Sequence, residues 1–157
     1  LEAVNFNSPG QVVIAGSKVI LEKSLESFKH AGAKRALLLP VSVPSHCKLM
    51  EPASILFNNY LNQVDFNMPD FPIIQNFEAI NYNNVDKIKL GLVKQLFNPV
   101  KWTQTINLLS TKGINLFIEA GPGKVLTGLN KRINKEALHF SISNEEVINE
   151  IFLQLRN

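Results

Sequence analysis

The sequence predicts an α/β fold in which a mainly parallel sheet is covered by helices. Two observations lead to this prediction. Short apolar segments typical of strands alternate along the chain with segments of helical periodicity, and turn residues or helix caps separate them. The 157 residues, of which 45% are hydrophobic, are enough for one ordinary domain with a sizeable core.

The first 43 residues predict the order strand, strand, helix, strand. The strands are expected at residues 3–7, 11–16 and 34–43, and the helix at residues 18–31. The Ser-Pro-Gly sequence at residues 8–10 is a turn signal. Ser17 is expected to cap the helix and Gly32 to end it. This order is what remains of a split β-α-β layer when one β-α unit is absent from its front.

Helices are more frequent after residue 43. They are expected at residues 47–64, 87–97, 100–113, 124–133 and 144–155, and strands at residues 71–77, 114–121 and 137–143. Asp86, Asn98 and Asn144 are the expected caps, with Pro99 at a first helical position and Gly113 as a stop. This increase in helical segments predicts a subdomain boundary near residue 43, which gives segments 1–43 and 44–157.

Composition and charge argue against several classes of function. The net charge is +3 and the pI is near 9.0, yet no run of basic residues and no basic–aromatic interleaving occurs, which argues against nucleic-acid binding. The mild positive charge suits an acidic protein partner. No apolar stretch is long enough for a membrane span.

The single cysteine and the first residues bear on the cellular setting. Cys47 has no second cysteine for an internal disulfide or a multi-cysteine zinc site, and it fits a reducing cytoplasm. No metal site is predicted. The chain starts without Met inside an expected strand and lacks a signal-peptide pattern, so we expect it to be part of something longer.

The Gly-Pro-Gly-Lys sequence at residues 121–124 follows an expected strand and opens an expected helix. Backbone N–H groups at such a helix start can bind a phosphate or a carboxylate. The spacing matches neither the P-loop nor the dinucleotide-binding pattern, because Leu126 occupies the last glycine position of the latter. A tight turn that needs glycine dihedral angles is therefore the favoured interpretation.

His46 is the histidine with a functional setting, since it follows an expected strand and precedes an expected helix. A packing role is the alternative, and it is the one that we assign to His30 and His139. A catalytic histidine needs a nucleophile, and Ser45 and Cys47 are too close along the chain to be good partners. No G-x-S-x-G sequence occurs. If His46 is a base, its partner is therefore not in this chain.

Four segments together carry a family resemblance: VNFNSPGQVVIAG, AGAKRALLLPVSVPSHCKLMEPA, VKQLFNPVKWTQTI and FIEAGPGKVLTGLNKRI. In this order they closely resemble the C-terminal half of malonyl-CoA:acyl-carrier-protein transacylases of bacterial fatty-acid synthesis. The resemblance implies the C-terminal part of a large α/β-hydrolase-like (acyltransferase) subdomain, at residues 44–157. It also implies part of an inserted ferredoxin-like subdomain, at residues 1–43.

The resemblance also implies roles for individual residues. His46 matches the catalytic histidine, and Gln95 matches the residue whose main-chain carbonyl holds that ring. Asn5 and Asn7 match the border of the substrate cleft. The nucleophilic serine, the arginine that pairs with the malonyl carboxylate and the oxyanion-hole amides have no counterparts here. Arg35 and Arg132 match other positions, and Ser45 does not reveal the acyl preference.

The implied activity is malonyl transfer from malonyl-CoA to the phosphopantetheine thiol of acyl carrier protein, through a malonyl-serine intermediate. It needs no cofactor beyond these two substrates, and a cytoplasmic location is expected. Two alternatives stay open. The chain could be an inactive fragment or remnant of such an acyltransferase, or its first residues could form a nucleic-acid-binding ferredoxin-like domain, although they lack paired aromatics for base stacking.

Overall fold

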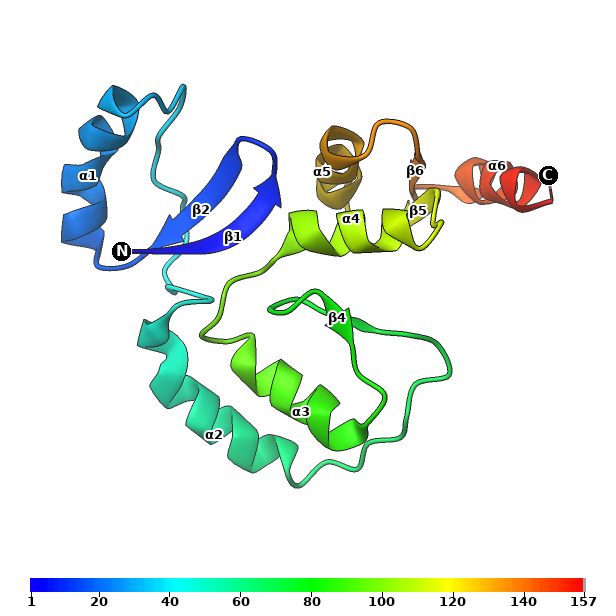
Figure 1. Ribbon diagram of the computed structural model, residues 1–157, viewed down its shortest axis with the longest axis horizontal. Coiled ribbons are helices and arrows are strands. Elements are labelled where there is room, and N and C mark those ends of the chain that lie inside the picture. The colour runs from blue at the N-terminus through cyan, green and yellow to red at the C-terminus, as the bar shows by residue number, and fades with distance from the viewer. Residues whose placement is uncertain (157) are drawn as a thin grey trace. The chain divides into compact units, whose positions relative to one another are not determined.

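The computed structural model describes residues 1–156 and has the mixed α/β character expected from the sequence (Figure 1). The chain forms two compact units. The first comprises Leu1–Phe6 and Val12–Lys101, and the second comprises Asn7–Gln11 and the residues from Trp102 onward. The expected subdomain boundary near residue 43 stays a prediction.

The chain begins with a hairpin and a helix, as expected. Strands β1 (Glu2–Ser8) and β2 (Gln11–Ala15) pair with each other, and Gly10 adopts a φ of 76° in the turn. Helix α1 (Lys18–His30) starts at Ser17, whose main-chain carbonyl accepts from Leu21 N at 2.9 Å but whose side chain makes no capping bond. Gly32, with a φ of 100°, lies just past its end.

The third strand expected at residues 34–43 does not form, and this prediction is wrong. These residues are irregular, and large apolar side chains among them, such as Leu39 (48%) and Val41 (71%), are exposed. A strand requires a neighbour for its N–H and C=O groups. Within residues 1–156, β1 and β2 pair only with each other and with an isolated bridge at Val100, so the apolar segment has no ladder to join.

The middle of the chain contains two helices and a small hairpin. A 3₁₀ turn, η1 (Lys48–Met50), leads into α2 (Glu51–Leu61), with a proline in its first turn. The strand expected at residues 71–77 is reduced to β3 (Ile74–Gln75), which pairs antiparallel with β4 (Ile80–Asn81). Phe71 is 70% exposed, so the apolar run is not a buried strand.

Two expected helix starts differ from the structure. Helix α3 (Val85–Lys94) is capped by Asn84, whose Oδ1 accepts from Lys87 N, whereas the expected cap Asp86 lies in the first turn. Helix α4 (Trp102–Thr111) begins later than Asn98-Pro99 predicts. Asn98 Nδ2 instead donates to Lys94 O at 2.8 Å, at the end of α3.

The segment between α3 and α4 is extended because its backbone pairs with β1. Val100 N donates to Val4 O at 2.9 Å and Val100 O accepts from Phe6 N at 2.9 Å, which forms a parallel bridge opposite Asn5. A backbone that satisfies its donors against a strand cannot at the same place be the first turn of a helix. This pairing ties the hairpin to the end of α3.

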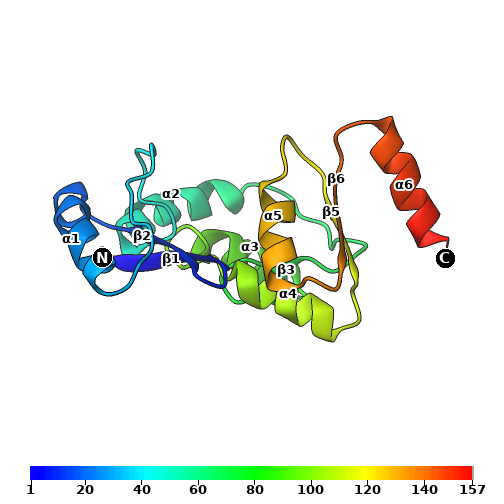
Figure 2. The same ribbon diagram turned by 90° about the horizontal axis from the view of Figure 1, so that it is seen from above.

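The second unit is built on a parallel strand pair, as the predicted α/β class requires. Strands β5 (Leu116–Glu119) and β6 (Leu138–Ser141) lie side by side, with Phe117 opposite His139 (Figure 2). Helix α5 (Val125–Ile133) packs against both strands and against α4. Helix α6 (Glu145–Leu155) is capped by Asn144, whose Oδ1 accepts from Val147 N, as expected. Ile106 of α4, 1% exposed, lies in this core.

Candidate active site around His46

The backbone of His46 has an uncommon conformation. Its φ is 66°, in the left-handed region that residues with a Cβ rarely occupy. Its N–H donates to Leu96 O at 2.9 Å. Such strain costs about 1–3 kcal/mol and persists where the surrounding structure imposes it, which is frequent at functional sites.

The imidazole ring of His46 is bound at the C-terminal end of α3. Its Nδ1 lies 2.6 Å from the main-chain oxygen of Gln95, the residue that caps this helix. The last carbonyls of a helix have no intrahelical partner and are free to accept. A carbonyl can only accept, so Nδ1 carries a hydrogen, and in the neutral ring the nitrogen without a hydrogen is Nε2. The structure thus brings together His46 and Gln95, two residues singled out in the sequence.

Asn76 extends this arrangement by one more side chain, which the sequence did not indicate. Its Nδ2 donates to Gln95 Oε1 at 3.2 Å, and its carbonyl accepts from Lys101 N at 2.8 Å. Asn76 follows β3 directly and is half-buried. An asparagine between Gln75 and Phe77 has no signature that distinguishes it from an ordinary turn residue, so only the fold reveals this contact.

An open pocket of about 240 Å³ adjoins the ring and is lined by Ser45, His46, Met50, Gln95 and Leu96. Cys47 is absent from this lining. It is 1% exposed, packs with Val4 and Ala15, and its Sγ donates to Pro44 O at 3.1 Å. A buried thiol of this kind is a packing group, so the structure does not offer Cys47 as a nucleophile for His46.

The two asparagines of β1 belong to different units. Asn5 is half-buried opposite Val100 in the parallel bridge, and Asn7 belongs to the second unit. Within the described part of the chain, neither side chain is hydrogen-bonded to His46 or Gln95. Their contact with substrate stays a prediction.

The helix start after the Gly-Pro-Gly-Lys turn is already occupied by a carboxylate of the same chain. Glu119, the last residue of β5, accepts from Thr127 N and Thr127 Oγ1 at 2.7 Å each, and from Leu126 N at 3.1 Å. The hydrogen bond from the Thr127 hydroxyl, and then those from the backbone, lower the pKa of Glu119 below its ordinary value. These amides are therefore not available to a phosphate, and the turn is structural.

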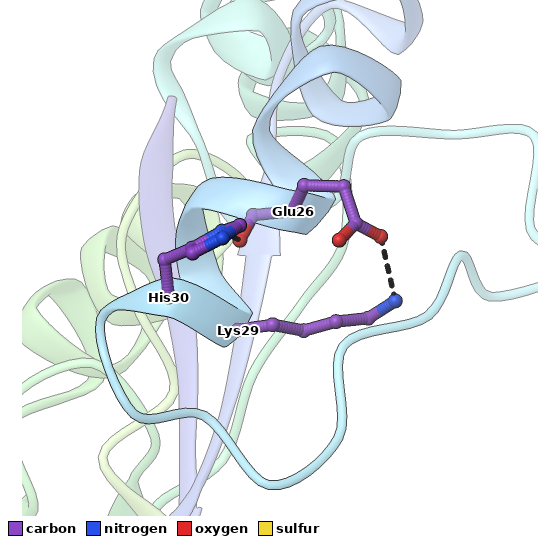
Figure 3. A network of polar contacts seen from close by, with 3 residues as sticks. All are labelled: Glu26, Lys29 and His30. Carbon is purple, nitrogen blue, oxygen red and sulfur yellow. Dashed lines mark hydrogen bonds and ion pairs between the residues drawn. The ribbon is translucent and has the colours of Figure 1, made fainter.

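The other two histidines make local contacts, in line with the packing role assigned to them. His30 Nδ1 donates to Glu26 O at 2.8 Å at the end of α1, beside an exposed Lys29–Glu26 ion pair of 2.7 Å (Figure 3). His139 Nε2 donates to Asn134 O at 2.7 Å, and its ring stacks on Phe117 with centroids 5.4 Å apart.

Residues 1–156 contain neither a metal centre nor a membrane-spanning helix. Among them, no three His, Cys, Asp or Glu side chains gather in a way that would hold a metal ion. No helix in the same range has the length and apolar character needed to cross a bilayer.

Comparison with known proteins gives a consistent set of relatives. No protein-family model matches the chain. A malonyl CoA-acyl carrier protein transacylase of Escherichia coli strain K12 is 52% identical over 130 residues, which is 83% of this chain and 42% of that protein. The chain matches the C-terminal half of such proteins.

Solved structures agree with this relationship. The crystal structure of an acyl carrier protein S-malonyltransferase from Vibrio cholerae matches with a TM-score of 0.92 and 47% identity, over 96% of this chain and 49% of that one. A malonyl transacylase in complex with a type II polyketide acyl carrier protein matches with a TM-score of 0.91 and 43% identity, over 99% and 50% of the two chains. The chain thus spans about half the length of the relatives that it matches.

Proposed function

Because the chain is homologous to the C-terminal half of malonyl CoA-acyl carrier protein transacylases, we propose that it supplies the general base of a malonyl transfer reaction. The substrates are malonyl-CoA and the phosphopantetheine thiol of an acyl carrier protein. The nucleophile is a serine from the remaining half of the fold. In this assignment, residues 44–157 belong to an α/β-hydrolase-like subdomain and residues 1–43 to an inserted ferredoxin-like one.

The proposed reaction has two half-reactions with one base. His46 Nε2 takes the serine hydroxyl proton as the serine oxygen attacks the thioester carbonyl, and then gives this proton to the departing CoA sulfur. The product is a malonyl-serine ester. In the second half-reaction His46 takes the proton of the carrier-protein thiol as its sulfur attacks the ester, and returns a proton to the serine oxygen. No metal or further cofactor takes part.

One observation carries the proposal, the 2.6 Å contact between His46 Nδ1 and Gln95 O. It fixes the ring orientation and the tautomer that leaves Nε2 able to accept a proton. A neutral carbonyl here takes the place that an acidic residue occupies in a Ser-His-Asp triad. The carbonyl also faces the positive charge that the ring acquires with each proton that it accepts.

The partner is proposed to be an acyl carrier protein, with the net charge of +3 favouring an acidic protein. A related transacylase forms a complex with such a carrier protein. Asn5 and Asn7 are proposed to border the acyl site, and the location is proposed to be cytoplasmic.

A second candidate is an inactive remnant of the same family. It is favoured by the absence of G-x-S-x-G from the 157 residues. To separate the two, the chain is joined to the N-terminal half of the Escherichia coli relative, and transfer of labelled malonyl groups to holo-acyl carrier protein is measured. The proposal predicts transfer by the hybrid and none by the chain alone. A folded hybrid without transfer, beside an active complete relative, would favour the remnant.

A further inference from the structure

We propose that Asn76 is a positioning residue for His46, and that it acts through Gln95. This inference rests on the proposed function, because it concerns how the proposed base is held. Asn76 does not contact the ring. It contacts the residue whose carbonyl binds the ring.

Asn76 is hydrogen-bonded to both ends of segment 95–101, and His46 is hydrogen-bonded to the same segment. Its side chain donates to Gln95 Oε1 at 3.2 Å, and its carbonyl accepts from Lys101 N at 2.8 Å. Between these two points lies Leu96, whose carbonyl accepts from His46 N at 2.9 Å. The half-buried Asn76 thus connects the two ends of this segment. The hydrogen bonds of His46, to Gln95 O and Leu96 O, are both made at the start of the segment.

Asn76 itself is well anchored. It follows β3, which pairs with β4 and lies against α3 at Gly91, where an added methyl group would meet Gln75 Oε1 at 2.7 Å. Ala79 N donates to Gln75 O at 2.8 Å and closes the turn between the two short strands. The side-chain amide of Asn76 therefore extends from a fixed backbone rather than from a free loop.

Holding Gln95 matters because it lies at a helix end. Terminal residues of helices fray, and a small change of dihedral angles at Gln95 would turn its carbonyl away from His46 Nδ1. His46 has an unfavourable φ of 66°, so its position depends on contacts of this kind. A tether on the Gln95 side chain restricts the rotation of this residue. Asn76 is thereby inferred to keep the ring in one tautomer and one orientation.

The direct test is nitrogen NMR of the histidine rings in this chain, at a pH where they are neutral. His30 and His139 are internal references, because their ring nitrogens bond to Glu26 O and Asn134 O and are remote from Asn76 in sequence and contacts. We expect His46 to have a protonated Nδ1. In Asn76→Leu, which keeps the branched shape of the side chain but removes the donor, the two His46 nitrogen shifts should move toward the averaged values of exchanging tautomers, while the references stay unchanged.

Two variants separate positioning from simple weakening of the helix end. Asn76→Asp should retain the His46 signature, because the Gln95 amide can turn and donate its Nε2 to the new carboxylate. Asn98→Leu removes the bond to Lys94 O at the same helix end without touching the Gln95 side chain, and it should also retain the signature. Unchanged His46 shifts in Asn76→Leu, or equal changes in Asn98→Leu, would overturn the inference.

Activity provides a second readout in the hybrid with the Escherichia coli half. Asn76→Leu should lower kcat for malonyl transfer by about tenfold, as outer contacts of functional histidines do, and leave KM for malonyl-CoA unchanged. If the parent hybrid folds but is inactive, the proposed function fails, while the NMR result still decides the role of Asn76. If the hybrid is active and Asn76→Leu is equally active, the positioning role fails alone.

Discussion

Gly91→Ala tests the close approach of α3 and β3 on which the arrangement around His46 depends. A Cβ at this position would lie 2.7 Å from Gln75 Oε1, 3.0 Å from Gln75 Cδ and 3.2 Å from Tyr82 Cε2. Gln75 is 4% exposed, so its side chain has no free space into which to turn. The substitution must therefore displace the buried side chain of Gln75, the residue that directly precedes Asn76.

The expected magnitude follows from two opposing effects. Replacing glycine by alanine inside a helix stabilises it by about 1 kcal/mol. Overpacking a filled site costs about 1–3 kcal/mol. We therefore expect Gly91→Ala to lower the local free energy of unfolding by about 1 kcal/mol, the difference between about 2 and about 1 kcal/mol.

Native-state hydrogen exchange is the suitable assay, because it reads the amides of α3 and α5 separately. Gly128→Ala in α5 is the matched control, since nothing lies within 4 Å of its Cβ position, and it should increase protection. Adding Gln75→Ala to Gly91→Ala should recover most of the lost free energy of unfolding, because it removes the side-chain atoms that the new Cβ meets and contacting residues have non-additive effects. If Gly91→Ala were as stabilising as Gly128→Ala, the close approach and the anchoring of Asn76 that we infer from it would be refuted.

Three further predictions concern stability. Burial, with the hydrogen bond and charge of Glu78, raises the pKa of Tyr82 from 10.0 to about 12. The protonated Tyr82 hydroxyl therefore contributes to the free energy of unfolding in full below pH 10, and this contribution is lost as the pH rises through about 12. Alkaline unfolding followed by circular dichroism should show that loss, and Tyr82→Phe should abolish it. The hydrogen bonds from Thr127 lower the pKa of Glu119. The ionised Glu119 therefore stabilises the fold in full above its ordinary pKa of 4.5, and this stabilisation is lost as the pH falls through the lowered pKa. Glu119→Gln should make exchange protection of α5 less dependent on pH below the ordinary pKa of 4.5, and an unchanged dependence would contradict the capping role. Ile106→Ala, at a side chain 1% exposed, should destabilise the second unit by about 2–5 kcal/mol in urea unfolding, and a loss below about 1 kcal/mol would show that this core is loosely packed.

Local sequence signals predicted most of the helices and the two longer strand pairs. The cap at Asn144 and the stop at Gly113, which has a φ of 85°, depend on neighbouring residues only, so they can be recognised without the fold. The Glu119 carboxylate at the start of α5 was not foreseen, because the residues that it joins are recognisable as partners only when β5 and α5 pack together.

The errors arose where tertiary pairing decides the outcome. The apolar segment 34–43 has the composition of a strand, but a strand exists only beside another strand. Asn98-Pro99 has the composition of a helix start, but Val100 pairs with β1 and keeps the chain extended. Sequence singled out His46 by its position and Gln95 by resemblance, whereas Asn76 and the left-handed backbone of His46 emerged only from the structure.

The central claim is that His46 is the base of malonyl transfer, and a single-turnover measurement tests it most directly. His46→Asn is the best variant, because asparagine tolerates the left-handed φ of 66° while it cannot take up the proton. In the hybrid with the Escherichia coli half, the rate of malonyl-serine formation from malonyl-CoA is followed by rapid quench. The account predicts a loss of at least about 100-fold. A rate within about threefold of that of the parent hybrid would contradict the claim, because general-base catalysis contributes a much larger factor to the rate.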